Sequence, residues 1–205
     1  MSTYNKEYYF ILELNNKSMP ILSPDEDTAE KPYTTQQLPL GTKPLIFENG
    51  RLDRQRAKNI TPVSPPPNIL FSGSNIVVKD NIREKLMLLD IENLAIQPSI
   101  YIDHKDHWHE NYWFLTFTDR FDCWDRDKST YDPDPLDQLG PPRYEIYTYS
   151  LNDDLLEKTP LKSRLIFKMG GTTEGNIVVH KSLAGLFNTS GAVLVPISDF
   201  GVTYP

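Results

Sequence analysis

Three of the four histidines of the chain lie within six residues of one another: His104, His107 and His109. Imidazole nitrogens bind zinc, nickel and copper, so these side chains are candidate metal ligands. A structural zinc site normally adds a second pair of ligands, and only Cys123 and His180 remain to supply one. We therefore expect no bound metal, and we interpret residues 103–110 as the polar tip of a hairpin.

Aspartates are concentrated in a second segment, between residues 119 and 137. They are Asp119, Asp122, Asp125, Asp127, Asp132, Asp134 and Asp137. Calcium loops place oxygen ligands at alternate positions around a central glycine and end in glutamate, and this segment has neither of those residues. The pattern favours a solvated acidic loop or a surface for a cationic partner.

Enzymatic motifs are absent from the sequence. Cys123 is the single cysteine, and as a nucleophile it would need a basic partner, for which only the distant His180 is available. The glycine-rich segment 170–175 lacks the Lys-Ser/Thr ending of a phosphate loop. No nucleophile elbow, zinc-protease motif or dinucleotide fingerprint is present. We predict that the protein is not an enzyme and has no cofactor.

All three tryptophans lie between residues 108 and 124, among the carboxylates described above. Tryptophan and tyrosine are enriched at the energetic centres of protein interfaces, and nearby charges help to select the partner. Trp113 is expected to be buried, because it alternates with Leu115 and Phe117 along an apolar strand. The predicted partner-binding residues are Trp108, Asp122, Trp124, Asp125, Asp127 and Tyr131.

The charge balance bears on the kind of partner. The chain has 28 acidic and 21 basic side chains, a net charge of −7, which matches a nucleic acid poorly and a basic protein well. An acidic surface also serves solubility alone. The apolar run 8–12 is too short for a signal-peptide core or a bilayer span, and one cysteine gives no sign of an oxidising compartment. We expect a cytoplasmic protein with no membrane or nucleic-acid partner.

The first third of the chain is expected to be a strand followed by loops and a linker. Residues 8–14 have the alternation of a half-buried strand, and residues 15–41 are proline-rich and polar. A short apolar run, 44–47, ends at Asn49-Gly50, which suits a tight turn. Four basic residues follow this turn: Arg51, Arg54, Arg56 and Lys58. Three consecutive prolines, at 65–67, come after them.

An internal similarity relates residues 70–98 to residues 166–196. Each segment has an apolar pair, a glycine-bearing turn and the tetrapeptide Asn-Ile-Val-Val, at 75–78 and at 176–179. A short helical pattern and an apolar strand ending at a proline follow in both. This order indicates two copies of a β-β-α-β unit, produced by duplication and packed on one shared core.

The helices of the two copies have short apolar faces. Ile82, Leu86 and Leu89 recur at helical spacing in the first copy. Asp80 and Ser182 are expected to cap the two helices.

The predicted fold class is α+β, with mixed, mainly antiparallel sheets and two short helices. We expect an N-terminal strand with loops and linker over 1–67, the first copy over 68–103, an aromatic and acidic insertion with a hairpin over 104–151, and the second copy over 152–205. Strands are expected at 112–118 and 144–151 of the insertion. Together these segments are expected to form one compact domain.

Several stretches resemble the immunity protein 11 family, formerly a domain of unknown function. They are PLIFENG at 44–50, PNILFSGSNIVV at 67–78, LIFK at 165–168, NIVV at 176–179 and VLVP at 193–196. The resemblance covers residues 44–198. It implies a small α+β protein that is encoded beside a polymorphic toxin, in contact-dependent or type VI secretion settings, and that binds and neutralises this toxin. No catalytic residues are defined for the family.

The functional expectation is an immunity protein that blocks a cognate, basic toxin through residues 101–142. One alternative is a structural or regulatory interaction module without a toxin partner. A second is a metal-dependent hydrolase that uses the three clustered histidines with Cys123 or an aspartate. The sequence leaves open the activity of the toxin and whether the free protein is a monomer or a homodimer.

Overall fold

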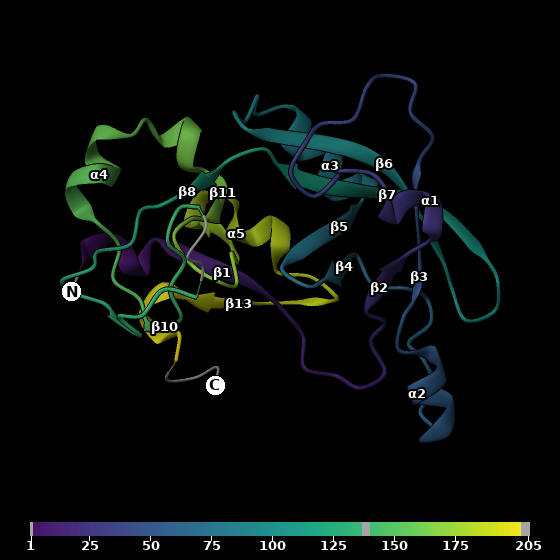
Figure 1. Cartoon of the computed structure of the whole chain (residues 1–205). Helices are drawn as coiled ribbons and strands as arrows, with labels where there is room; N and C mark the ends of the chain where they lie inside the picture. The colour runs from purple at the N-terminus through teal and green to yellow at the C-terminus, as the bar shows by residue number, and fades with distance from the viewer. Residues whose placement is uncertain (1, 137–139, 202–205) are drawn as a thin grey trace. The chain divides into compact units, whose positions relative to one another are not determined.

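A computed structural model describes residues 2–136 and 140–201 of the chain (Figure 1). The chain forms two compact units. Unit 1 comprises residues 1–12, 119–188 and 194–205, and unit 2 comprises residues 13–118 and 189–193. The described residues contain five α-helices and mixed, mostly antiparallel sheets. The predicted α+β class is therefore confirmed. The sequence suggested two helices, and these are the two longest of the five.

Unit 2 is built on a six-stranded sheet with the strand order β2-β3-β6-β7-β5-β4. Its strands are β2 (Leu22–Pro24), β3 (Leu45–Asn49), β4 (Ile69–Ser72), β5 (Asn75–Lys79), β6 (Leu94–Ile102) and β7 (Trp108–Phe117). β3 pairs with β6 in parallel, and every other pair is antiparallel. β7 lies in the middle, where it pairs with β6 on one side and β5 on the other.

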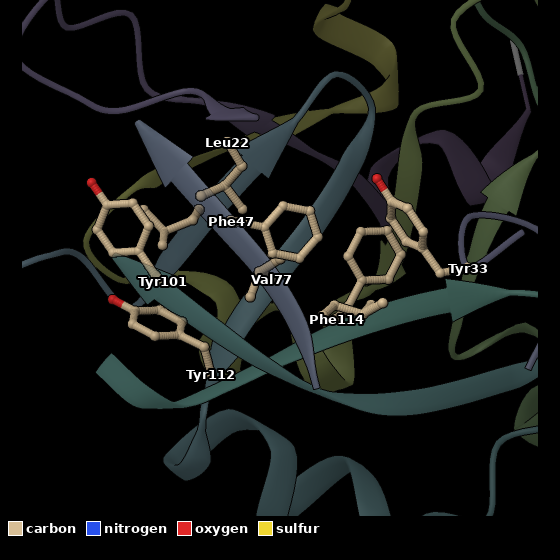
Figure 2. Packing of buried hydrophobic residues seen from close by; sticks show 9 residues of the cluster. Leu22, Tyr33, Phe47, Val77, Tyr101, Tyr112 and Phe114 are labelled. Carbon is tan, nitrogen blue, oxygen red and sulfur yellow. The ribbon is translucent and has the colours of Figure 1, made fainter. Parts of the chain in front are cut away.

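Aromatic side chains from several strands form the core on one face of this sheet (Figure 2). Phe47 of β3 and Phe114 of β7 stack with ring centroids 5.9 Å apart, and the ring of Tyr33 meets Phe114 edge-on at 4.9 Å. Tyr101 and Tyr112 close the other end of the cluster, also edge to face. Such pairs add to the free energy gained from burying their apolar surface.

Three helices belong to unit 2: α1 (Glu26–Ala29), α2 (Leu52–Ala57) and α3 (Asp80–Met87). Helix α3 lies on Trp113, which is half-buried rather than fully buried as expected. The indole Nε1 of Trp113 donates to Asp80 at 2.6 Å, and the guanidinium of Arg83 stacks on the ring at 4.1 Å. Asp80 is the first residue of α3, and its carboxylate binds Trp113. The side-chain cap expected from Asp80 does not form.

Residues 15–67, expected to be loops and a linker, contribute four elements to unit 2. They are β2, α1, β3 and α2. The segment joins the fold because Leu22 and Phe47 are buried in the aromatic core. α1 begins at the side chain of Asp25, which accepts a hydrogen bond from the backbone N–H of Thr28.

Unit 1 contains a five-stranded sheet with the order β13-β1-β12-β11-β8 and a two-stranded sheet of β9 and β10. The strands are β1 (Tyr8–Glu13), β8 (Arg120–Phe121), β9 (Thr130–Tyr131), β10 (Ile146–Thr148), β11 (Ile166–Met169), β12 (Ile177–His180) and β13 (Ala192–Pro196). β8 is parallel to β11, whereas β12 is antiparallel to both β1 and β11.

The α-helices of unit 1 are α4 (Asp153–Lys158) and α5 (Lys181–Phe187), and short 3-10 helices lie at Thr3–Lys6, Leu161–Arg164 and Ile197–Asp199. α5 is capped by His180, whose Nδ1 accepts from the backbone N–H of Ser182, so the expected cap at Ser182 is wrong. Across both units, no helix of the described residues combines the length and apolar character that crossing a membrane requires.

The two segments with the shared tetrapeptide have the same order of elements. The first forms β4, β5, α3 and β6 in unit 2, and the second forms β11, β12, α5 and β13 in unit 1. In each sheet one strand from elsewhere in the chain, β7 or β1, lies between the second and third strands of the segment. The segments lie in different units, each in its own sheet, and their origin by duplication stays a prediction.

The segment 104–151, expected to be an insertion between the copies, is divided between the units. Its strand β7 is an internal strand of the unit 2 sheet and begins at Trp108, four residues earlier than expected. Residues 119–151 belong to unit 1. The strand expected over 144–151 is reduced to β10, whose pairing with β9 shifts register between Ile146 and Thr148. Further along, Leu151 forms only an isolated antiparallel bridge with Trp124.

We expect Phe114→Ala to lower the free energy of unfolding by about 3–5 kcal/mol, because it removes a ring that is packed between Tyr33 and Phe47. Urea unfolding followed by tryptophan fluorescence measures the change. Leu88→Ala is the control, since Leu88 is 85% exposed and its loss should change the same quantity by about 0.5 kcal/mol or less. Equal effects of the two substitutions would contradict this description of the core.

Candidate partner-binding surface

The tip of the β6–β7 hairpin, residues 103–107, is organised by the side chain of Asp103. Its Oδ1 accepts hydrogen bonds from the backbone N–H groups of Lys105 at 2.8 Å and His107 at 3.1 Å. The backbone N–H of Asp103 donates to the carbonyl of His107 at 3.0 Å. One carboxylate therefore satisfies the donors that a tight turn leaves unpaired, as aspartate does in Asx turns.

The second oxygen of Asp103 faces two of the clustered histidines. Oδ2 lies 3.0 Å from Nε2 of His109 and 3.6 Å from Nδ1 of His107. Burial alone would raise the pKa of Asp103, but the hydrogen bond from His109 and those from the backbone outweigh it and lower this pKa to about 2. The carboxylate is thus ionised, and the proton of the shared hydrogen bond resides on the imidazole of His109.

Two of the three clustered histidines, His107 and His109, are partners of Asp103. The ring of His109 also stacks on Tyr101, with centroids 6.0 Å apart, so the ring is held by one hydrogen bond and one ring contact. His104 lies in the turn and does not join His107 and His109 at Asp103. Within residues 2–136 and 140–201, no group of three or more histidine, cysteine, aspartate or glutamate side chains is arranged to hold a metal ion.

Trp108, the first residue of β7, carries the large exposed apolar surface of this hairpin. Its side chain is 58% exposed. Strand β5 pairs with β7 only at residues 112–114. On the other side β6 pairs with Trp108 and His109 and, after a register shift, again from Tyr112, so within the described residues the β5 side of 108–111 is an open edge. An open edge with an exposed aromatic beside it suits contact with another chain.

The acidic residues of unit 1 are largely engaged in local contacts. Asp122 forms a bidentate ion pair with Arg126, at 2.5 and 2.6 Å. Asp125 accepts from the backbone N–H groups of Asp127 and Lys128 and pairs with Lys128 Nζ at 2.9 Å. The hydrogen bond from Lys128 lowers the pKa of Asp125. Asp127 is exposed, and Asp137 lies outside the described residues.

Trp124, which the sequence analysis expected at the partner-binding surface, is buried with 1% of its surface exposed. Its ring packs edge-on against Tyr131 at 4.9 Å and Tyr144 at 5.9 Å. The guanidinium of Arg126 covers the ring at 3.7 Å. Trp124 is thus part of the packing of unit 1, and Tyr131, half-buried beside it, contributes to the same packing.

The six residues predicted to bind a partner are divided between the two units. Trp108 belongs to unit 2, whereas Asp122, Trp124, Asp125, Asp127 and Tyr131 belong to unit 1. The chain passes from unit 2 to unit 1 between Thr118 and Asp119, so closeness in the sequence does not place Trp108 in the same unit as the other five residues. Among the six, Trp108 is the large apolar side chain that is exposed, and Asp122 and Asp127 are also exposed.

The residues considered for catalysis are in unsuitable surroundings. Cys123 is fully buried, and burial raises the pKa of its thiol, so it is held in the unreactive protonated form. His180 caps α5. In the described part of the chain, no serine, threonine or cysteine is hydrogen-bonded to His109, which leaves the His109–Asp103 pair without the nucleophile that a catalytic triad requires.

Asp103 is the residue that the sequence analysis missed. It was named only as the boundary of the histidine-rich segment, yet it fixes the turn and both nearby histidines. The signal was present: an aspartate with a polar, strand-flanked turn directly after it is typical of a side chain that caps its own turn.

Comparison with models of known protein families and with curated proteins finds no match for the chain.

We predict that Asp103→Asn lowers the free energy of unfolding by about 2 kcal/mol at neutral pH, because the folded state lowers the pKa from 3.8 to about 2. A depressed carboxylate pKa stabilises the fold above the unfolded-state value, and this stabilisation is lost as the pH falls from about 4 to about 2. Urea unfolding of both proteins at pH 7, 4 and 3 measures the difference, which should shrink at the lowest pH. A difference independent of pH would exclude the charge of Asp103 as the cause.

The two tryptophans should differ sharply in their effect on stability. Trp124→Ala is expected to cost about 3–5 kcal/mol, because it empties a packed site, whereas Trp108→Ala should cost about 0.5 kcal/mol or less. Thermal unfolding followed by circular dichroism compares the two variants. A larger loss of stability in Trp108→Ala than in Trp124→Ala would show that their environments have been assigned wrongly.

Proposed function

We propose that this chain is a cytoplasmic immunity protein that binds a cognate toxin and blocks it by occlusion, using the tip of the β6–β7 hairpin. The resemblance of residues 44–198 to the immunity protein 11 family supports the class of function. The net charge of −7 supports a basic partner, since long-range attraction between opposite charges accelerates association.

The observation that carries the proposal is the exposure of Trp108 on a hairpin whose conformation is already fixed. A tryptophan at the centre of an interface buries a large apolar surface. Binding normally costs entropy when loops become ordered, but Asp103 holds this turn through two backbone donors and His109. Trp108 can therefore enter a pocket on the toxin with little further ordering of its own strand.

The surroundings of Trp108 suggest the mode of contact. Residues 108–111 have an open strand edge on one side, which offers backbone donors and acceptors to a segment of the partner. His107 is exposed beside it, and Glu110 adds a carboxylate two residues along the strand. Occlusion by such a surface needs no catalytic group in the immunity protein, only a position that excludes the substrate of the toxin.

The test is protection of growing cells from the protein encoded by the adjacent gene. We expect the wild-type chain to restore growth when that protein is expressed and to co-purify with it. Trp108→Ala should weaken the complex by about 2 kcal/mol or more, with a faster dissociation rate, as is typical of a residue central to an interface. Surface plasmon resonance measures the rate.

Leu88→Ala provides the matched control, because Leu88 is also an exposed apolar residue of unit 2 but lies after α3. It should leave both protection and dissociation unchanged. Protection that survives Trp108→Ala would move the interface away from the hairpin. An adjacent gene product that is harmless and does not bind would instead favour an interaction module without a toxin.

A further inference from the structure

Unit 2 contains a pocket of about 220 Å³ between the loop 14–18 and the segment 51–60. Every charged side chain that lines it is a cation: Lys17, Arg51, Arg54 and Lys58. No acidic residue lines it, although the chain as a whole carries a net charge of −7. Four like charges around one pocket in an acidic protein call for an anion, because without one they repel one another.

Helix α2 explains how the sequence gathers these cations. Arg51, Arg54, Gln55 and Lys58 stand at positions i, i+3, i+4 and i+7, which form one face of a helix. Lys17 reaches the same pocket from the loop that follows β1. Arg56, also on α2, does not line the pocket and approaches Asp53 at 3.8 Å. The helix thus separates three pocket cations from one cation outside it.

Ion pairing leaves three of the four cations available. Arg51 pairs with Glu13 at 3.0 Å. Lys17, Arg54 and Lys58 have no carboxylate partner among the residues that the structure describes. A dianion in the pocket would face three positive charges that no described carboxylate neutralises.

Gln55 fixes the two walls of the pocket relative to each other. Its side chain is buried, with 2% of the residue exposed, and its Nε2 donates to the carbonyls of Lys17 at 2.9 Å and Met19 at 3.2 Å. Its Oε1 accepts from Nδ2 of Asn49 at 2.8 Å. All its hydrogen bonds are internal, so Gln55 positions the cations and leaves ligand contact to them.

We infer that this pocket binds a small anion through phosphate groups, either free inorganic phosphate or diphosphate or the phosphorylated end of a small metabolite. Arginine and lysine together suit such a group, because arginine donates in bidentate fashion and lysine adds a compact charge. No aromatic side chain lines the pocket, so it lacks the aromatic surface on which bases usually stack. The volume is also below the ~300–1,000 Å³ of pockets that enclose drug-sized ligands.

Isothermal titration of the full chain with inorganic diphosphate, at low ionic strength, tests the site. We expect saturable binding, weaker binding of inorganic phosphate, and no added affinity for adenosine diphosphate beyond that of diphosphate. Arg54→Gln and Lys58→Gln should each raise the dissociation constant about tenfold, since each removes a hydrogen bond between a cation and the anion. A sugar phosphate that binds more tightly than diphosphate would identify the phosphorylated metabolite as the source.

Arg56→Gln is the matched control, since it removes one positive charge from the same helix outside the pocket. It should leave the affinity unchanged, and thermal unfolding should show that all three variants are folded. If a pocket variant proves unstable, amide chemical shifts of the wild-type chain provide the second measurement, and diphosphate should shift the resonances of residues 17 and 54–58.

Absence of diphosphate binding to the wild type at low ionic strength would overturn the inference. So would an equal loss of affinity in Arg56→Gln, because the attraction would then reflect general charge. Binding of a single-stranded oligonucleotide without binding of diphosphate would also overturn it, in favour of a nucleic acid. The pocket shares no residue with the hairpin tip, so its failure leaves the proposed toxin contact untouched.

Discussion

The simultaneous pairing of β7 with β5 and β6 is the interaction on which unit 2 depends. Through it the β4–β5 hairpin is joined to β6, β3 and β2 in one sheet. The same strand sends Phe114 into the aromatic core on one face and holds Trp113 beneath α3 on the other. Its first residues run past the end of β5 and form the exposed tip. The strand that carries the candidate surface is therefore anchored by the core of the unit, which keeps that surface rigid.

Local pairing decides which charges of this acidic protein can act on a partner. In unit 1, Asp122 and Asp125 are each paired with a cation within four residues, so these two aspartates add little net negative charge to the surface. At the hairpin tip, the carboxylate of Asp103 accepts hydrogen bonds from the backbone of its own turn. The cations of the α2 pocket behave in the opposite way. The helix brings three of them together, and of the four pocket cations only Arg51 has a carboxylate partner among the described residues, Glu13 of β1.

The fold class and the order of elements could be predicted from periodicity. The alternation in 112–118 and the repeated tetrapeptide correctly indicate β7, β5 and β12. The predictions that the structure contradicts concern features that depend on contacts between residues far apart in the sequence. Trp124 is buried because Tyr131 and Tyr144 close over it, and no local pattern at 124 reports a contact with 144. Likewise, Pro-rich residues 15–67 read as a linker, because β2 and β3 are short and gain their stability from a sheet formed later in the chain.

The arrangement of β1 has a consequence for how the protein is made. Nearly all of unit 2 lies in one run of the chain, 13–118, and can form as soon as that run has left the ribosome. β1 emerges earlier still, yet its neighbours β12 and β13 begin only at residues 177 and 192. At a synthesis rate of about 5–20 residues per second, Phe10 and Ile11 remain without their sheet for roughly ten seconds or more. During biosynthesis the first strand is thus an unpaired apolar segment tethered to a folded neighbour, and exposed apolar segments of this kind are what chaperones bind.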